Sequence, residues 1–502
     1  MSHLCRATLC RTALLLGIVC GAATSDAAIT FEFDYQYDTA GFFDPPERRE
    51  ALEMAGKLFD RYVDDLAEVT PDENNTWQSF IVDPGGNAGL QIVQDIPVAE
   101  DTVIVYVASN NIGGDLAHTF AAPGIATGTP EFEDAYHFRS QEGAGDSPAT
   151  DFGVWGGSIS FNSNAEAVPW YFGLEENGIA AHEFDFITVA VHELTHLMGF
   201  GTAKSYSDYI TSKLIPANGN DPARLAKVFE GPEAIAVGSP SNRMLELDSH
   251  TDGQHLKDGT KSRHAGRLQD ALLAPGIFIG ERQFLTELDR AILRDIGWEE
   301  GRAGDANLDR IFNSADLITM FQAAKYETNQ LAAWSDGDFN DNARFTSSDL
   351  TAAFAEAWYV AAATSADIPD DGPDEPVTVE YDSTNGQLRI ENSHQLSTFE
   401  LTSEDEQFLP AKAVSFDGPF DVSRSDKLFL LSVDGIADEV ALGNVLPAGL
   451  SLAELEADLS FDGSLTQGGR LADVRLHIVP EPNYSLILVV SAILLAVRRA
   501  DR

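Results

Sequence analysis

The stretch His192-Glu193-Leu194-Thr195-His196 lies within an apolar run over residues 187–200, and this run predicts one buried helix. Residues four apart share a face of a helix, so His192 and His196 are expected to bind one Zn²⁺ together. Glu193 would lie beside them as the general base for a water that the metal acidifies. The pattern is typical of enzymes that hydrolyse peptide bonds.

The residues around this stretch also favour a buried helix. Gly199 follows it, at a place where a helix commonly ends in the left-handed conformation. The alternative is a surface helix that carries two solvated histidines and a solvated glutamate. Apolar residues flank the histidines on every side, and this disfavours the surface helix.

The composition sets wider bounds. The chain has 502 residues, 44% hydrophobic and 22% charged, which is typical of a globular protein with roughly two to four domains. Its net charge of −48 at pH 7 argues against nucleic acid as a partner, because nucleic acid is itself anionic. Such acidity suits Ca²⁺ binding or a saline exterior, and a well-solvated surface is the simpler explanation.

Residues 1–28 are expected to form a secretory signal peptide. A basic start precedes an apolar core over residues 13–23, and small residues follow at a plausible cleavage site. All three cysteines lie in this segment: Cys5, Cys10 and Cys20. The mature protein is therefore expected to be exported and free of disulfides. Lipidation at Cys20 is the alternative.

Residues 479–502 combine Pro480-Glu481-Pro482, an apolar run over Tyr484–Val497 and the pair Arg498-Arg499. This layout resembles the PEP-CTERM sorting signal of Gram-negative bacteria. The resemblance implies a short transmembrane segment that an exosortase processes, and a location at the cell surface or outside the cell. The run is shorter than the about 20 residues that span a bilayer. A plain tail anchor is the alternative, with the arginines cytoplasmic in either case.

Residues 29–300 are expected to form the first unit, which mixes strands and helices. The expected strands are Ile29–Tyr37, Thr102–Ala108 and Gly153–Phe161, and the expected helices besides the zinc helix are Pro46–Leu66 and Leu288–Ile296. The stretch Gly156–Phe161 precedes the zinc helix, so we expect it to be an edge strand that a substrate joins by backbone hydrogen bonds. An ordinary strand inside a sheet is the alternative.

Residues 303–360 contain two copies of one motif, which begin at Gly304 and Gly337. Oxygen-bearing side chains fall at loop positions 1, 3, 5, 9 and 12 of both copies, and this spacing wraps a hard cation as an EF-hand loop does. The first set of expected Ca²⁺ ligands is Asp305, Asn307, Asp309, Asn313 and Asp316. The second set is Asp338, Asn340, Asn342, Thr346 and Asp349. Helices are expected over residues 317–326 and 350–359.

The pair of loops resembles a dockerin type I module along its whole length. The resemblance implies two structural Ca²⁺ ions and a cohesin-like partner. Position 6 is glycine in an ordinary EF-hand, whereas Arg310 and Ala343 stand there in this chain. A left-handed residue with a Cβ atom costs on the order of 1 kcal/mol. Two turns that cap helices and bind nothing are the alternative.

Residues 364–376 are rich in Pro and Asp and are expected to be a linker. Residues 377–478 are expected to form a β-sandwich of short strands separated by Gly and Asp turns. The expected strands are Thr378–Tyr381, Leu388–Ile390, Phe399–Leu401 and Leu428–Leu431. A binding role and a passive stalk remain equally open for this part.

A catalytic zinc needs a third protein ligand. Thr202 stands where the short spacing of related zinc sites would place a histidine, and Glu230 and Glu233 lack the helical pattern of a glutamate ligand. The remaining candidates are His255, His250, His264 and Asp248.

A family resemblance favours His255. The segments 186–201, 271–275 and 285–298, together with His255, resemble the catalytic block of leishmanolysin-like metalloproteases, and more closely that of exported bacterial metalloproteases with a similar sorting tail. In that arrangement the third histidine comes late and a Met-containing turn passes beneath the metal, which implies that His255 is the third ligand. Leu273 occupies the place of the methionine and can fill a similar volume. The resemblance spans roughly residues 150–298.

Together these patterns predict an α+β zincin-like catalytic domain, a small α EF-hand or dockerin-like module and an all-β sandwich. They indicate an exported zinc metalloendopeptidase that acts on a protein or peptide. The alternative is a non-catalytic adhesion or scaffold protein of the cell surface with a structural zinc helix. Glu193 distinguishes the two, because a structural site is closed by a fourth ligand and needs no general base.

Overall fold

The structure is a computed structural model that describes residues 28–63, 65–121, 124–217, 222–238, 245–356, 359–360, 376–433, 435–466, 470–471 and 474–479. Apart from their boundary residues, the expected signal peptide, linker and sorting segment lie outside the described residues. Within the described part of the chain, every helix is too short or too polar to cross a bilayer.

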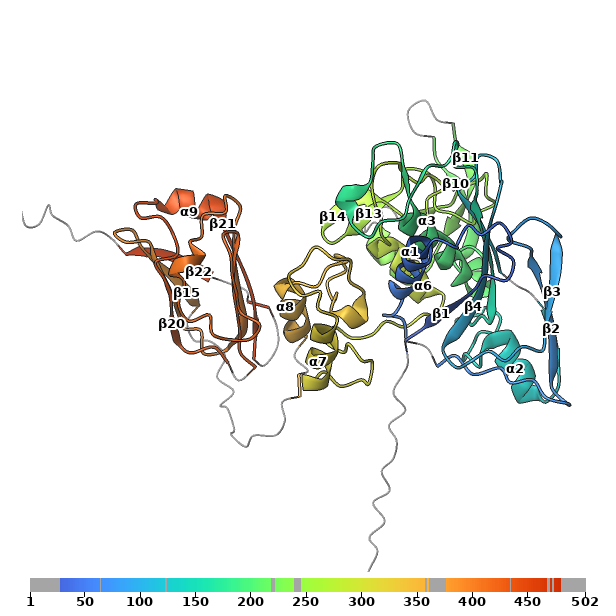
Figure 1. The fold of residues 1–502 in the computed structure, drawn as a ribbon, viewed down its shortest axis with the longest axis horizontal. Coiled ribbons are helices and arrows are strands. Elements are labelled where there is room, and N and C mark those ends of the chain that lie inside the picture. Colours follow the sequence, from blue (N-terminus) through green and yellow to red (C-terminus); the bar gives the residue numbers. More distant parts are fainter. Residues whose placement is uncertain are drawn as a thin grey trace, which may run out of the picture.

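A four-stranded sheet forms the centre of the first unit, in the order β1-β4-β7-β5 (Figure 1). Its strands are β1 (Thr30–Asp34), β4 (Thr102–Asn110), β7 (Gly156–Asn162) and β5 (Ala117–Ala121). The first three run parallel, and β5 runs antiparallel to β7. The side chains of β4 alternate between two apolar cores, and both faces of this strand are therefore buried.

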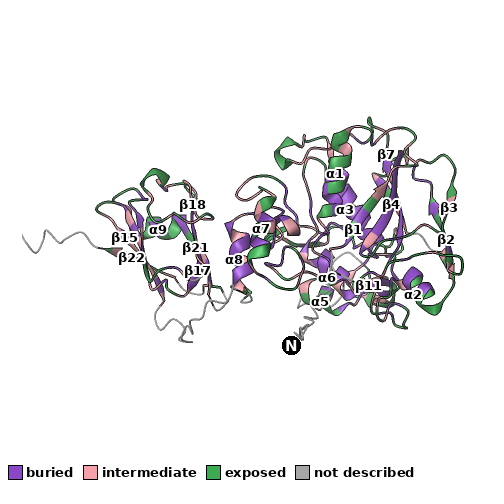
Figure 2. Cartoon of the chain, turned by 60° about the horizontal axis from the view of Figure 1, so that its bottom comes forward, coloured by how far each residue is buried: buried purple, intermediate pink, exposed green. Residues whose placement is uncertain are grey.

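Two helices cover one face of this sheet. α3 (Phe186–Leu197) packs against β5 and β7, and α1 (Pro46–Lys57) packs against α3 and β1. In Figure 2 the buried residues concentrate on α3 and on the central strands. The prediction of a helix up to Leu66 was wrong, because the chain turns after Lys57. This turn lets the carbonyl of Tyr62 accept a hydrogen bond from the N–H of Ile29.

A second, antiparallel sheet in the order β3-β2-β6 covers the other face of the central sheet. Its strands are β2 (Thr76–Val82), β3 (Leu90–Gln94) and β6 (Gly124–Thr127). The other helices of the first unit are α2 (Pro130–Phe138), α4 (Lys204–Asp208), α5 (Pro232–Gly238) and α6 (Glu287–Asp295), with the short helix η1 (Glu176–Gly178). Its other strands are β8 (Trp170–Tyr171), β9 (Phe184–Asp185), β10 (Ile210–Ile215), β11 (Arg224–Phe229), β12 (Leu245–Glu246), β13 (Lys261–His264) and β14 (Arg267–Asp270).

The expected edge strand over Gly156–Phe161 is not at an edge. This segment belongs to β7, which pairs with β4 on one side and with β5 on the other. β5 forms the edge of the sheet beside α3 instead. The sequence of β7 does not reveal this, because a strand and its neighbour in the sheet are separated along the chain.

The two loop motifs form a small module with α7 (Ser314–Gln322), η2 (Trp334–Asp336) and α8 (Ser347–Ala355). The module lies between the first unit and the C-terminal strands (Figure 1). Leu331, Ala333 and Ala343 of the module belong to the apolar core of the first unit. The carboxylate of Asp60 also accepts hydrogen bonds from the N–H groups of Trp334 and Ser335. The module and the first unit therefore share one packed interface.

The C-terminal strands form two four-stranded sheets around a second core. One sheet has the order β20-β16-β15-β22 and the other β18-β19-β17-β21. The strands are β15 (Val377–Asp382), β16 (Gln387–Glu391), β17 (Leu396–Ser403), β18 (Val422–Ser423), β19 (Lys427–Leu431), β20 (Glu439–Gly443), β21 (Leu459–Leu465) and β22 (Val474–Val479), with the helices η3 (Pro410–Lys412) and α9 (Leu452–Asp458). The expected strands over Thr378–Tyr381, Leu388–Ile390, Phe399–Leu401 and Leu428–Leu431 all lie within strands of these sheets.

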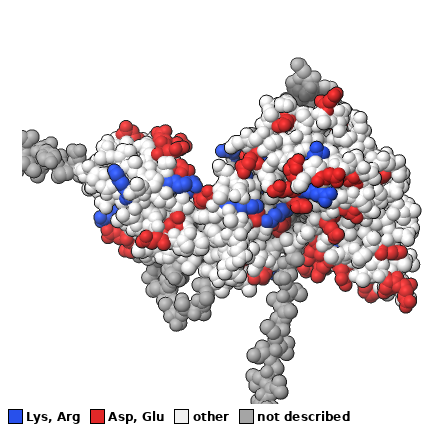
Figure 3. Space-filling model, viewed as in Figure 1, with Lys and Arg blue, Asp and Glu red and all other residues white. Residues whose placement is uncertain are grey.

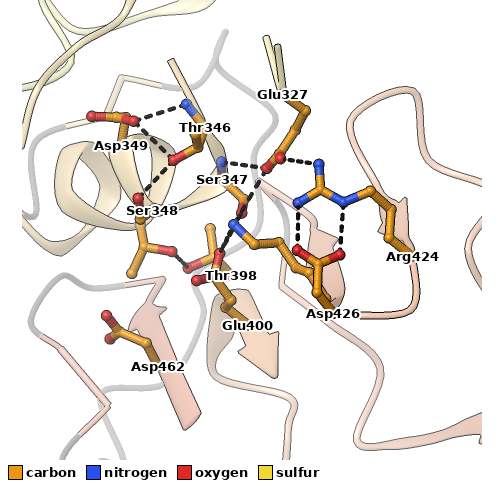
Figure 4. A network of polar contacts seen from close by, with 12 residues as sticks. Glu327, Thr346, Ser347, Ser348, Asp349, Thr398, Glu400, Arg424, Asp426 and Asp462 are labelled. Carbon is orange, nitrogen blue, oxygen red and sulfur yellow. Dashed lines mark hydrogen bonds and ion pairs between the residues drawn. The ribbon is translucent and has the colours of Figure 1, made fainter. Parts of the chain in front are cut away.

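A polar network joins the module to these sheets (Figure 4). The hydroxyl of Ser347 at the start of α8 donates to the Glu400 carboxylate, and Lys427 lies 2.8 Å from the same hydroxyl. Glu327 of the module pairs with Arg424 at 2.6 Å. The rings of Phe321 and Phe420 stack beside it, with centroids 4.2 Å apart. The module thus contacts other parts of the chain on two sides.

Arg139 ties together the segments that enter the central sheet. Its side chain is buried and donates hydrogen bonds to the carbonyls of Leu66, Ala67, Ala99, Thr102 and Val154. Thr102 begins β4 and Val154 shortly precedes β7. A single guanidinium therefore satisfies backbone oxygens that would otherwise be buried without donors.

We expect Arg139→Met to destabilise the fold by roughly 3 kcal/mol or more, because methionine keeps the bulk but leaves these buried carbonyls unpaired. Urea unfolding followed by tryptophan fluorescence measures the change in free energy. Arg224→Met is the control: the pair of Arg224 with Glu246 is partly exposed, so its loss is expected to change stability by about 0.5 kcal/mol or less. Equal effects of the two substitutions would contradict the role given to Arg139.

Candidate metal centre

Helix α3 presents the central motif from a buried position. The carboxylate of Asp185 caps the helix by accepting from the N–H of Thr188 at 2.9 Å. All of its residues from Phe186 to Leu197 are buried, so the helix has no solvent-facing side. Gly199 follows with a φ of 97°, which is the left-handed conformation that was expected to end the helix. The motif therefore lies inside the first unit.

The structure brings His192, His196 and His255 together. Their Nε2 atoms are separated by 3.2 Å (His192 to His196), 3.1 Å (His192 to His255) and 3.0 Å (His196 to His255). Within the described residues, this is the single group of three or more His, Cys, Asp or Glu ligand atoms that all lie within 4.8 Å of one another. The three imidazoles come from a helix and from a loop about 60 residues later in the chain.

The hydrogen bonds at Nδ1 determine which nitrogen atoms are free. The Nδ1 of His192 lies 2.8 Å from the carbonyl of Leu272, and the Nδ1 of His196 lies 2.9 Å from the carbonyl of Phe200. A carbonyl can only accept, so both Nδ1 atoms carry the proton and both Nε2 atoms present lone pairs. Burial lowers the pKa of both imidazoles, to about 4 for His196, which keeps them neutral.

A cation fits among these nitrogen atoms. The lone pairs of His192 and His196 face each other 3.2 Å apart, and they repel one another unless a positive charge lies between them. A tetrahedral ion with metal–nitrogen bonds of about 2.0–2.1 Å separates its ligand nitrogens by roughly 3.4 Å. The observed separations are close to that value. Three neutral imidazoles are a donor set that suits zinc.

The loop that carries His255 is held against the end of α3. The N–H of Leu256 donates to the carbonyl of Leu273 at 2.9 Å, and Tyr206 donates its hydroxyl proton to the carbonyl of Gly253 at 3.0 Å. Gly201 permits the close approach, because a Cβ atom at this position would lie 2.5 Å from the carbonyl oxygen of Gln254. The segments that contain Gly201 and Leu273 thus pack against the loop and determine the position of His255.

The turn over residues 271–274 lies directly beside the triad. The carbonyl of Leu272 accepts from His192, while the N–H groups of Leu272 and Leu273 donate to the carboxylate of Asp289 at 3.0 and 3.2 Å. Asp289 is fully buried near the start of α6, where it also closes a capping box with Thr286. Leu273 is itself fully buried at the place that resembles a Met-containing turn.

Glu193 lies next to the triad and contacts β5. The hydroxyl of Thr119 donates to its Oε2 atom at 2.6 Å. Burial raises the pKa of Glu193 to about 7, and the hydrogen bond from Thr119 opposes this shift. A carboxyl group with a pKa near neutrality is suited to accept and return a proton.

The other candidates for the third ligand lie elsewhere. The side chain of His250 is 93% exposed and pairs with Asp248. His264 stacks on Phe284 and its Nδ1 bonds the carbonyl of Leu285. Glu230 pairs with Lys213. None of these residues, nor Glu233 or Thr202, joins the group of converging nitrogen atoms in the described structure.

The two loops of the module repeat one pattern of hydrogen bonds. At position 1, Asp305 accepts from the N–H groups of positions 5 and 6, and Asp338 does the same in the second loop. At position 12, Asp316 and Asp349 each accept from the N–H groups of positions 2, 3 and 9. Burial raises the pKa of all four carboxyl groups.

The side chains at the middle positions of these loops each bond their own nearby backbone groups. Asn307, Asp309, Asn340 and Asn342 accept hydrogen bonds from nearby N–H groups, Asn313 caps α7, and Thr346 precedes α8. Position 6 is left-handed in both loops, with φ of 64° at Arg310 and 56° at Ala343. The turn that glycine normally permits thus forms with a Cβ atom present. Calcium binding by these residues stays a prediction.

Sequence reasoning missed the groups that support the triad. Thr119 was not singled out, and Asp289 entered only as part of the segment 285–298 of the family resemblance, with no role given to it, although each hydrogen-bonds a residue of the motif or of the adjacent turn. Their signals in the sequence are weak, because a threonine in a strand and an aspartate near the start of a helix are common. Only the fold brings these residues to the site.

Comparison with known proteins identifies no relative of this chain. The chain matches no protein-family model, and neither a curated protein nor a solved structure is significantly similar to it. The chemistry of the site therefore carries the functional argument.

We expect His255→Ala to abolish retention of zinc after dialysis, because the remaining two imidazoles hold a metal far more weakly than three. Elemental analysis of the purified chain measures the bound zinc. His250→Ala is the matched control, since this exposed imidazole lies outside the triad, and it is expected to retain zinc like the wild type. Loss of zinc in His250→Ala alone would contradict the assignment of His255.

Proposed function

We propose that this chain is a zinc-dependent endopeptidase. The observation that carries the proposal is the convergence of three imidazole Nε2 atoms beside the buried carboxylate of Glu193. The group has three members among the described residues, so a metal there would keep a coordination position open. A catalytic centre needs such a position, whereas a structural zinc site fills it with a fourth protein ligand.

The residues of the chain have separate tasks in this proposal. His192, His196 and His255 would hold the zinc, which when bound supplies a Lewis acid that polarises a carbonyl and acidifies water. Glu193 accepts the proton of the attacking water and then donates it to the leaving amine. The hydroxyl of Thr119 orients Glu193 and favours its ionised form. The carbonyls of Leu272 and Phe200 keep two imidazoles in the tautomer that binds a metal.

The position of β5 at the edge of the sheet favours a polypeptide as the substrate. Among the described residues β5 has β7 as its single strand partner, so its other edge is free to form backbone hydrogen bonds. Thr119 lies on this strand and contacts Glu193. An extended peptide paired with β5 would therefore pass beside the general base. This assigns to β5 the role that the sequence had suggested for Gly156–Phe161.

Two segments near the termini and the loop pair bear on where this chain is located and what it binds. The signal-like residues 1–28 and the sorting-like residues 479–502 support an exported protein that an exosortase processes at the surface of a Gram-negative cell. The loop pair supports structural Ca²⁺, with a cohesin-like partner as the further expectation from its resemblance. Acidic groups are spread over each unit on the face in Figure 3, and this argues against nucleic acid as a substrate.

We expect Glu193→Gln to lower proteolysis by roughly 100- to 10,000-fold, because the amide cannot accept the proton of water. The substitution keeps the size of the side chain and all three imidazoles, so zinc content is expected to match the wild type. Cleavage of casein or of a peptide library measures the activity, and elemental analysis measures the zinc. Undiminished cleavage by the variant would refute the role of Glu193.

The same assay separates the enzyme from the alternative of an adhesion or scaffold protein. A chelator removes both zinc and calcium, so zinc and calcium are added back singly. Recovery of cleavage with zinc, with no recovery from calcium alone, supports the metalloendopeptidase. Absence of cleavage by the zinc-loaded wild-type chain on every peptide tested would favour the adhesion protein.

We expect Thr119→Val to lower kcat about tenfold, since a hydrogen bond to a charged group contributes about 1.5 kcal/mol. The hydroxyl stabilises the ionised carboxylate, so its loss raises the pKa of Glu193. The reaction needs the ionised form, and the acidic limb of the pH–rate profile is therefore expected to move to higher pH. Thr119→Ser keeps the hydroxyl and is expected to keep the wild-type profile. An unmoved acidic limb in Thr119→Val would contradict this role.

A further inference from the structure

The module of the two loops contacts the first unit through Asp341. One carboxylate oxygen of Asp341 pairs with the guanidinium of Arg61, and the other lies 2.9 Å from that of Arg290. The three side chains are between 10% and 19% exposed, so the pairs are largely shielded from solvent. Salt screens a shielded ion pair less than a surface pair. Removal of one partner of a shielded pair also destabilises the protein more, because the other charge is left buried and unpaired.

The repeat itself shows that Asp341 has a separate role. Asp341 stands at position 4 of the second loop, between the expected ligands Asn340 and Asn342, and Leu308 stands at position 4 of the first loop. Leu308 is buried in the apolar core of the module. Both residues have a left-handed backbone, with φ of 56° at Leu308 and 64° at Asp341. The same turn therefore presents an apolar group inward in one copy and an acid to the first unit in the other.

Arg290 connects this contact to the histidine triad. It follows Asp289 on α6, and Asp289 accepts from the N–H groups of the turn over residues 271–274. The carbonyl of Leu272 in that turn accepts from Nδ1 of His192. One helix thus contacts the module through Arg290 and supports the turn through Asp289.

A small cavity lies between the module and the back of the zinc helix. Its volume is about 50 Å³, and Val191, Arg290, Asp341 and His264 contribute to its lining. Val191 directly precedes His192 on α3. The module therefore covers the first unit behind the helix that carries the motif.

We propose that Asp341 is a positioning residue for the histidine triad. Its carboxylate holds Arg290 and Arg61, keeps α6 in place, and so holds the turn over residues 271–274 against His192. On this view the module braces the catalytic unit of the same chain. The consequence for catalysis rests on the proposed function, whereas the mechanical coupling does not.

Hydrogen–deuterium exchange of the full chain tests the coupling without any need for activity. We expect Asp341→Asn to speed exchange in the peptide over residues 271–274 by about fivefold or more, because local opening becomes easier. Asp341→Glu keeps the charge and is expected to restore most of the protection. In cleavage assays, Asp341→Asn is expected to lower kcat with little change in KM, since no substrate contact is lost.

Glu356→Gln is the matched control in the same module. Glu356 pairs with Arg302 in an exposed position, so its loss is expected to leave exchange over residues 271–274 unchanged. The strand β19 provides an internal reference for general loosening. Exchange in Asp341→Asn that equals the wild type over residues 271–274, or that rises equally in β19, would overturn the proposal. A wild-type chain without proteolysis but with the expected exchange pattern would refute only the proposed function.

Discussion

The site depends on the two hydrogen bonds that the Nδ1 atoms of His192 and His196 donate. Because carbonyl oxygens accept these bonds, both Nε2 atoms must present lone pairs, and together with His255 they converge within 3.2 Å of each other. Such an arrangement is unfavourable without a cation, which is why it supports a metal centre. The acceptors are backbone groups at Leu272 and Phe200, so the backbone fold around α3 determines the chemistry of the imidazoles.

Support for this backbone extends outward in layers. Asp289 holds the turn that contains Leu272, α6 holds Asp289, and Arg290 on the same helix meets Asp341 of the module. The module in turn contacts the C-terminal sheets through the network in Figure 4. These contacts link parts of the chain more than 100 residues apart to the surroundings of one centre. They also show that a module resembling a docking element is in close contact with its own chain on two sides.

Local patterns in the sequence predicted many of the helices and strands. The apolar run around the motif lies in helix α3, the buried stretch over Thr102–Ala108 lies in β4, and four expected strands lie in the C-terminal sheets. These elements have strong periodicity or length, so local residues decide their state. Predictions failed where segments far apart in the chain meet. α1 ends at Lys57, and the turn after it lets Tyr62 pair with Ile29. β7 lies inside the sheet because β5 pairs with its other side.

The sequence by itself determined the motif of α3, the spacing of the two loops and the acidic character of the chain, because these depend only on the order of residues. The resemblance that favoured His255 agrees with its place in the triad. Only the tertiary structure decided that Thr119 and Asp341 belong to the surroundings of that triad, and which backbone groups Asp289 holds there. Each is a common polar residue in an ordinary element, and its role arises from contacts between segments far apart in the chain, which no local pattern encodes.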